Sequence, residues 1–125
     1  MIYGIGTDIV KIARIKNAVD KWGDRFLRRI WTENEIAYCH TQKDPFPSLA
    51  ARFAAKEAVI KALSSDSSAS LIEIEVVRDI KGKPGITTSG ATRNFMISKK
   101  IGNCHLSLSH EQEFAIAYAI LELTP

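Results

Sequence analysis

Apolar and polar residues alternate in several short stretches of the chain, as they do in strands with one buried face. The clearest stretches are MIYGIGTDIV, residues 1–10, and LIEIEVV, residues 71–77. The turn sequence DIKGKPG then leads into a further strand at ITT, residues 86–88. Near the C-terminus, HLSLSH and FAIAYAILEL alternate on either side of EQE, residues 111–113. We therefore expect these two stretches to form a hairpin.

Helical periodicity occupies most of the rest of the chain. After the loop TQKDPFP, a long helix is predicted over Ser48–Leu63, and the serine-rich SSDSSAS ends it. A shorter helix is expected at Ala91–Lys100, with Gly102 just past its end as a helix-terminating glycine. Without repeats or an obvious linker, the pattern predicts one mixed α and β domain over residues 1–125. Three more short helices are expected near Ile12–Val19, Arg25–Ile30 and Glu33–Cys39.

The long helix SLAARFAAKEAVIKAL has an unusual distribution of charge. Ser48 is a suitable N-cap, and Phe53 and Ile60 mark an apolar stripe together with Leu49. Glu57 falls at the edge of that stripe and Lys61 one turn further on, while the other faces are mostly alanine. The two charges could simply pair, which contributes about 0.3–0.5 kcal/mol when exposed. A carboxylate and an ammonium on a helix built for burial are also candidates for chemistry.

The first strand carries a second candidate. Gly4, Gly6 and Asp8 share one face, and the two glycines remove side chains just before the carboxylate. This indicates close approach by backbone or ligand, although a bulge with Asp8 capping a turn is the simpler alternative. If Asp8 met Glu57 in space, the two carboxylates would suit Mg²⁺ with coordination positions left for phosphate.

Composition narrows the class of protein. With 125 residues, 46% hydrophobic and 25% charged, the chain has an ordinary globular composition. No apolar run is long enough to span a bilayer and no leader pattern precedes the first strand, so we expect a cytoplasmic protein without a membrane partner. Cys39 and Cys104 lack zinc-site spacing and are interpreted as free thiols.

Positive charge is concentrated near the N-terminus. From Lys11 to Arg29 there are seven Lys or Arg residues against Asp20 and Asp24, a local balance of +5 in a chain of net charge +3. Such a segment suits an acidic partner: nucleic acid, an anionic membrane or an acidic protein. The alternative is an ordinary solvated helix face.

Several familiar catalytic patterns are missing from the sequence. HLSLSH places His105, Ser107 and Ser109 on one strand face and His110 on the other, but no nucleophile elbow accompanies them. GIGTD lacks the third glycine of a dinucleotide fingerprint, and there is no P-loop.

Three motifs together resemble a known family. GIGTDIV near the N-terminus, RFAAKEAVIKAL in the middle and SLSH near the C-terminus are similar, in order and spacing, to the small bacterial holo-acyl-carrier-protein synthases. These form the short-chain branch of the 4′-phosphopantetheinyl transferases. The resemblance implies an α+β fold in which a mostly antiparallel sheet wraps around one long helix. It also implies homotrimers with active sites between subunits.

The resemblance further implies a reaction and its residues. The 4′-phosphopantetheine group would pass from coenzyme A to a serine of apo-acyl carrier protein, supporting fatty acid biosynthesis. Asp8 and Glu57 would hold Mg²⁺, and Lys61 would stand by the diphosphate as the third catalytic residue. Arg52 and His110 would approach the phosphates. The base would be Glu57, acting directly or through a metal-bound water.

In this interpretation the basic segment docks the acidic carrier protein. Arg14 matches a carrier-contacting position of the family, and we expect Lys21, Arg25 and Arg28 to extend that surface. The competing hypothesis is a non-catalytic module that binds an acidic protein or nucleic acid through this segment. It would not need Asp8 or Glu57, and we expect no nucleic-acid partner.

The chain departs from the family after the long helix. Where relatives usually carry G-T-G, this chain has SSDSSAS, residues 64–70, without glycine. Hydroxyl and amide groups there can still donate to phosphate, but Asp66 would repel it if it pointed inward.

Overall fold

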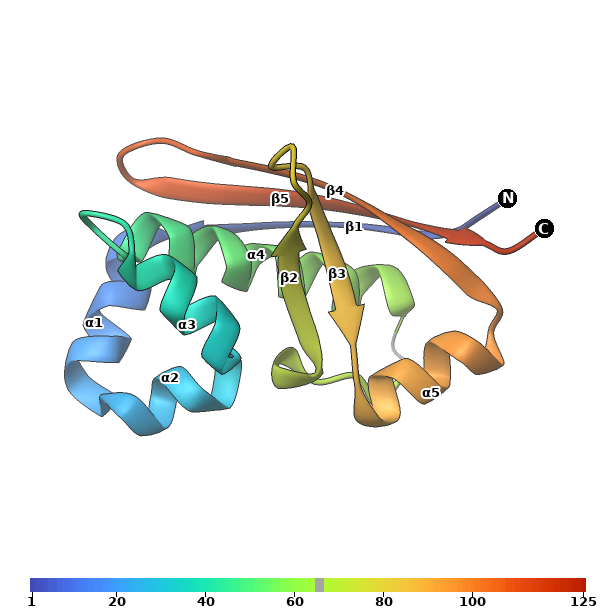
Figure 1. The fold of residues 1–125 in the computed structure, drawn as a ribbon, viewed down its shortest axis with the longest axis horizontal. Coiled ribbons are helices and arrows are strands. Elements are labelled where there is room, and N and C mark those ends of the chain that lie inside the picture. Colours follow the sequence, from blue (N-terminus) through green and yellow to red (C-terminus); the bar gives the residue numbers. More distant parts are fainter. Residues whose placement is uncertain (65–66) are drawn as a thin grey trace.

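The computed structural model describes residues 1–64 and 67–125 and has the predicted α+β architecture. Strands β1, β5 and β4 form one antiparallel sheet in that order, and β2 and β3 form a separate antiparallel pair (Figure 1). The elements in chain order are β1 (Ile2–Lys11), α1 (Ile12–Trp22), α2 (Asp24–Ile30), α3 (Glu33–His40), α4 (Phe46–Leu63), the 3₁₀ helix η1 (Leu71–Glu73), β2 (Ile74–Arg78), β3 (Pro84–Thr88), α5 (Gly90–Ser98), β4 (Ile101–His110) and β5 (Phe114–Leu123).

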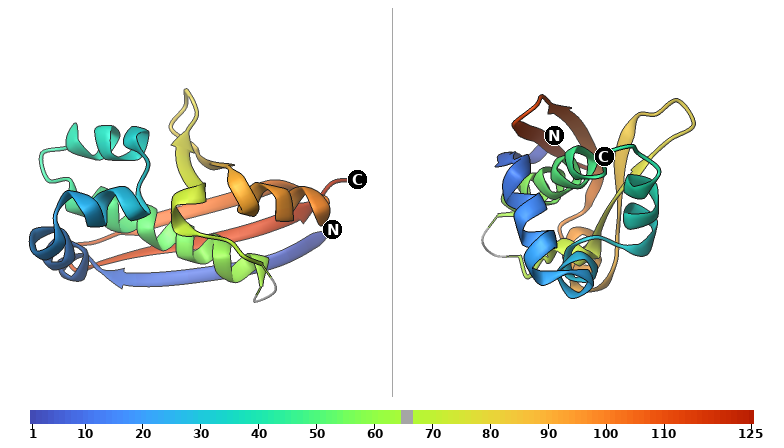
Figure 2. Two further views of the ribbon diagram at one scale, coloured as in Figure 1. Left: turned by 90° about the horizontal axis from the view of Figure 1, so that it is seen from below. Right: turned by 90° about the vertical axis from the view of Figure 1, so that its left-hand side faces the viewer.

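Helix α4 lies at the centre of the molecule. Figure 2 shows it along the inner face of the three-stranded sheet, with the N-terminal helices at one end and the β2–β3 pair beside it. Its alanines face the sheet, where Ala115, Ala117 and Ala119 of β5 are fully buried. Small side chains on both surfaces let helix and sheet approach closely, so the core between them is thin and dense.

The glycines of β1 allow the closest approach. An ideal Cβ on Gly4 would lie 2.0 Å from the carbonyl oxygen of Ala62, and one on Gly6 would lie 1.9 Å from that of Ala58. Both obstacles are helix backbone. The sequence left open whether backbone or ligand needed this space, and the structure shows that the helix occupies it.

A buried ion pair fixes the opposite side of α4. Lys56 Nζ lies 2.6 Å from Glu35 Oε1 on α3, and both side chains are fully buried. Lys56 also donates to the carbonyl oxygens of Leu71 and Ile74, while Glu35 accepts from the backbone N–H groups of Thr32 and Val76. Burial lowers the pKa of Lys56, and the Glu35 carboxylate opposes that shift. This network joins α3, α4 and β2.

The predicted elements are largely confirmed, including the β4–β5 hairpin and the end of the long helix at Leu63. The N-cap prediction is wrong, because α4 begins at Phe46 and Ser48 lies inside its first turn. Pro47 is tolerated in that turn because its missing N–H needs no intrahelical partner. The N–H of Phe46 instead donates to Asp44 Oδ1 at 3.0 Å.

Two other local predictions are corrected. Residues 71–73 form η1 instead of continuing a strand, because Glu73 turns toward α5 and accepts from Ala91 and Thr92. Gly102 belongs to β4, and the left-handed residue after α5 is Lys100, with φ 59°.

The apolar stripe predicted on the long helix is not its core side. Phe53 and Ile60 are only half-buried, and Glu57 lies among them. The alanine-rich faces, with Leu49, are the buried ones. The predicted stripe was defined by the large apolar side chains. Alanine contributes little hydrophobicity and yet permits the closest packing, so the alanine-rich faces were not recognised as the core side.

We expect Gly6→Ala to destabilise the protein by at least about 1–3 kcal/mol, because the added methyl group meets helix backbone that cannot move aside. Gly85→Ala is the matched control, since no described atom lies within 4 Å of its ideal Cβ. Urea unfolding measures both changes. Equal stability of the two variants would contradict the close-packing argument.

Candidate active site

Asp8, Glu57 and Lys61 come together, as the sequence predicted. The inner face of β1 presents Asp8 two residues after Gly6, where the strand runs along α4. Lys61 Nζ donates to Asp8 Oδ1 at 3.1 Å and to the carbonyl oxygen of Thr7 at 3.0 Å. Asp8 is paired with Ala117 in a regular part of the ladder, so the alternative of a bulge at Asp8 is wrong.

The two carboxylates lie within electrostatic reach of each other. Asp8 and Glu57 line the same cavity of about 350 Å³, together with Arg14, Phe26 and other residues. Burial raises the pKa of Glu57, the negative charge of Asp8 raises it further, and Lys61 opposes both. A cation bound between the two carboxylates would offset both the burial of Glu57 and its repulsion by Asp8.

The donor set matches one kind of metal. Within the described ranges, no group of three or more His, Cys, Asp and Glu side chains is arranged to hold an ion. Two carboxylates are nevertheless what Mg²⁺ takes when water and substrate phosphates supply its remaining ligands. The residues present therefore fit Mg²⁺.

Arg52 and His110 line a different cavity, of about 360 Å³, with Tyr38, Ser48 and Arg78 among its other walls. Arg52 is buried, with its guanidinium 4.3 Å from the Tyr38 ring centroid and Nη1 3.4 Å from Ser48 Oγ. Its Nε is a buried side-chain nitrogen without a hydrogen-bond partner among the described residues. A buried guanidinium with an unused donor beside a cavity is suited to bind an anion.

The two cavities share no lining residue. Arg52 and Glu57 are five positions apart on α4, which places them about 140° apart around its axis. Within one copy of the chain, the carboxylates and the arginine cavity therefore lie on different sides of the same helix.

The basic side chains chosen as docking candidates lie in three different surroundings. Arg14 lies at the carboxylate cavity, whereas Arg25 and Arg29 line another cavity of about 400 Å³ with Trp22 and Phe26. The Lys21 ammonium lies 4.9 Å from the Trp22 ring centroid. Arg28, by contrast, forms ion pairs with two neighbouring carboxylates, those of Asp24 at 3.0 Å and Glu33 at 3.1 Å.

Sequence reasoning missed several residues around these cavities. Arg78 joins Arg52 and His110 only because the β2–β3 pair folds against α4, and no local pattern indicated this. Tyr38 and the Lys56–Glu35 pair were also missed, because their contacts depend on how α3 packs against α4. The expectation about Asp66 lies outside the described residues.

Comparison with known proteins identifies the class. The sequence model of the 4′-phosphopantetheinyl transferase superfamily matches residues 4–119, and the chain belongs to this superfamily.

Its relatives narrow the class to one enzyme. The holo-[acyl-carrier-protein] synthase of Halothermothrix orenii is 44% identical over 123 residues, 98% of each chain. That of Dehalococcoides mccartyi strain CBDB1 is 47% identical over 122 residues, 98% of this chain and 99% of the relative.

Solved structures agree with this assignment. The holo-[acyl-carrier-protein] synthase of Neisseria meningitidis superimposes with a TM-score of 0.89 at 36% identity, covering 98% of this chain and 99% of the other. The Helicobacter pylori enzyme, solved in complex with coenzyme A, has a TM-score of 0.82 at 37% identity, with 94% and 99% coverage.

Proposed function

We propose that this chain transfers the 4′-phosphopantetheine group of coenzyme A to a serine of apo-acyl carrier protein. The products are holo-acyl carrier protein and adenosine 3′,5′-bisphosphate, and the reaction supports fatty acid biosynthesis. The observation that carries the proposal is the shared cavity of Asp8 and Glu57, with Lys61 held on Asp8. The relatives named above, which match over nearly the whole chain, support it.

The chemistry is a displacement at phosphorus. The serine oxygen forms a bond to the phosphorus that carries pantetheine, and the bond from that phosphorus to the bridging oxygen breaks. The serine proton passes to a base, for which Glu57 is the nearest candidate, directly or through water. Lys61, whose ammonium is held on Asp8, would stabilise the negative charge that develops on the leaving group.

Asp8 and Glu57 are the residues that would hold Mg²⁺. When bound, the ion neutralises the diphosphate and polarises the phosphorus. Burial and then the negative charge of Asp8 raise the pKa of Glu57, and a cation would favour the ionised form of both carboxylates, which supports this placement.

We place the nucleotide phosphates of coenzyme A at Arg52 and His110. The unused Nε of Arg52 supports this, and Arg78 adds a third basic side chain to the same cavity. The Helicobacter pylori relative, which was solved with coenzyme A bound, shows that an enzyme of this fold takes the same ligand.

We infer that three copies assemble with each active site between two of them. The outer face of the sheet supports assembly, because Ile5 is 66%, Ile9 61% and Tyr118 50% exposed. Ile5 is paired with Ile120 and Ile9 with Ile116, so these side chains make one apolar band across β1 and β5. Assembly would also let the carboxylates of one copy face the arginine cavity of another.

We infer that the acidic carrier protein docks on α1 and α2. Arg14 lies at the carboxylate cavity itself, where the reacting serine must arrive. Lys21 and Arg25 extend the positive surface beyond it, and Arg28 contributes less because Asp24 and Glu33 already neutralise it.

Two broader inferences accompany the reaction. Residues 1–125 would act as one transferase domain, since the superfamily match runs from 4 to 119. We place the protein in the cytoplasm, where its free cysteines, Cys39 and Cys104, would stay reduced. No helix among the described elements is long and apolar enough to cross a membrane.

Mass spectrometry of apo-acyl carrier protein, after incubation with this protein, coenzyme A and Mg²⁺, tests the reaction. We expect the mass of one phosphopantetheine group to be added. Asp8→Asn and Glu57→Gln should each abolish turnover while circular dichroism shows an intact fold. Near-normal activity of either variant would refute the site.

Mixing two inactive variants tests the shared active site. Glu57→Gln removes a carboxylate and His110→Ala removes a phosphate contact on the other cavity. If sites form between copies, co-refolded mixtures should recover a fraction of the activity that neither variant has alone. A monomer by light scattering, or no recovery from mixed oligomers, would contradict the arrangement.

If the carrier protein docks on α1 and α2, removing positive charge there should change KM for the carrier protein and not KM for coenzyme A. Arg14→Ala should raise KM for the carrier protein several-fold, with a smaller rise for Arg28→Ala, and neither should change KM for coenzyme A. Salt at about 0.5 M should shrink both effects, since charges are screened beyond about 8 Å already at physiological ionic strength. Lys99→Ala, just past the end of α5, is the control. A rise in KM for coenzyme A alone would make this segment a nucleotide site.

A further inference from the structure

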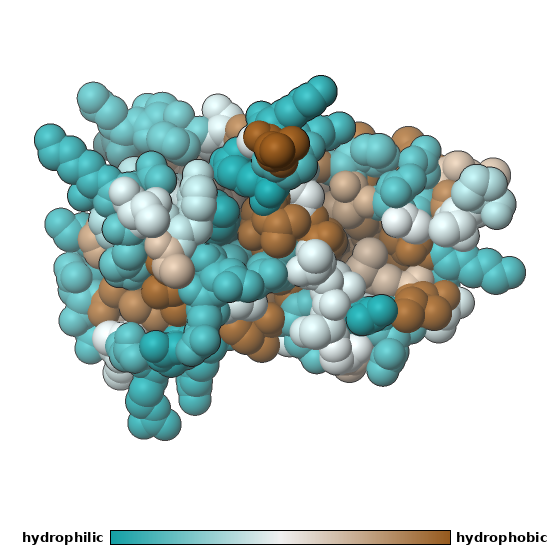
Figure 3. Space-filling model, in the orientation of Figure 1, coloured by the Kyte–Doolittle hydropathy of each residue, from teal (hydrophilic) through white to brown (hydrophobic). Residues whose placement is uncertain are grey.

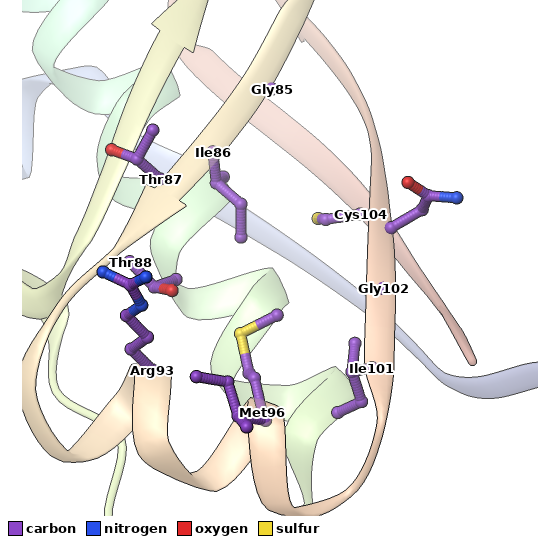
Figure 4. A pocket seen from close by; sticks show the side chains of 11 residues that line it. Gly85, Ile86, Thr87, Thr88, Arg93, Met96, Ile101, Gly102 and Cys104 are labelled. Atoms are coloured by element: carbon purple, nitrogen blue, oxygen red, sulfur yellow. The ribbon is translucent and has the colours of Figure 1, made fainter. Parts of the chain in front are cut away.

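A fourth cavity lies between β3, α5 and β4. It has a volume of about 590 Å³ and shares no lining residue with the carboxylate or arginine cavities. Figure 3 shows apolar surface in the hollow to the right of centre, and Figure 4 shows the cavity from close by. The size falls in the range typical of small-molecule sites.

Apolar side chains from three elements converge on this cavity. Ile86 of β3, Met96 of α5, and Ile101 and Cys104 of β4 point toward one another across it (Figure 4). Burial raises the pKa of the Cys104 thiol to about 12, so the sulfur stays protonated and neutral at physiological pH. These side chains therefore make an apolar wall on one side of the cavity, while Thr87, Thr88 and Asn103 add polar groups to the rest of its lining.

One end of the cavity carries a positive charge. Arg93, in the first turn of α5, extends toward Thr88 at the end of β3 (Figure 4). The side chain takes part in no hydrogen bond or ion pair with the described residues. The carboxylate of Glu73 is close by, but it is occupied with the N–H groups of Ala91 and Thr92 at the helix start. Arg93 is thus an available cation beside an apolar wall.

We propose that this cavity binds a linear amphipathic carboxylate, such as a medium-chain fatty acid. The carboxylate pairs with the guanidinium of Arg93, whose planar fork donates to two oxygens at once. The alkyl chain lies along Ile86, Met96, Ile101 and Cys104. The charge favours an anion, and the apolar side chains beside it favour a ligand that carries a hydrocarbon chain.

Decanoate, octanoate and hexanoate are the probes for titration calorimetry on the full chain, with the methyl signals of Met96 and Ile101 followed by NMR. We expect affinity to rise about fourfold per buried methylene group until the wall is filled. The shifted signals should be those of the cavity residues. Addition of coenzyme A should leave decanoate affinity unchanged, because the sites are separate.

Variants of one exposed side chain make the test specific. Arg93→Ala should weaken decanoate about tenfold, because the carboxylate loses its charged partner, and Arg93→Lys should recover part of the loss. Lys99→Ala, just past the end of the same helix, should bind as the wild type does. Decanol and acetate, which lack the charge and the chain respectively, should bind much more weakly than decanoate.

Four results would overturn the proposal. Three of them are the absence of decanoate binding to the folded protein, equal affinity of the Arg93→Ala variant, and equal affinity for decanol. Displacement of decanoate by coenzyme A would also overturn it, by placing the chain at the transferase site.

Discussion

Close contact between α4 and the first strand is the constraint on which the site depends. Gly4 and Gly6 bring β1 against the carbonyl groups of Ala62 and Ala58, leaving no room for any other residue. The next inward position on the strand is Asp8, so its carboxylate meets the helix one turn from Ala58. The alternation of residues along β1 therefore has two effects. It lets the glycines pack against α4, and it places Asp8 Oδ1 3.1 Å from Lys61 Nζ.

The rotation of α4 about its own axis is fixed from the other side. Lys56 points into the protein, where Glu35 and two carbonyl groups surround its ammonium. Removing one partner of such a pair would leave a buried charge, at a cost of about 3–5 kcal/mol. Because Glu57 follows Lys56 directly, an anchored Lys56 turns the next side chain toward the carboxylate cavity. The buried pair thus positions a residue that it does not contact.

A single helix supplies charged side chains to two cavities on different sides of its axis. Glu57 and Lys61 serve the cavity beside β1, whereas Arg52 serves the cavity beside β4. A ligand with several phosphates and a metal ion needs both kinds of surface. An apolar outer band on the sheet offers a way to bring them together between copies, and assembly would then complete the site as well as cover exposed Ile5 and Ile9.

Local spacing along the chain was enough to predict the alternating strands, the terminal hairpin and the motifs that carry Asp8, Glu57 and Lys61. The packing of whole elements was needed to show that Glu35 meets Lys56, that Arg78 joins Arg52, and that η1 interrupts a predicted strand. Packing also determines which face of α4 is buried. An alanine-rich face has little hydrophobicity of its own, and it becomes the core side because the glycines of β1 can lie directly against it. Contacts between distant residues are set by how whole elements pack, and no local pattern encodes that.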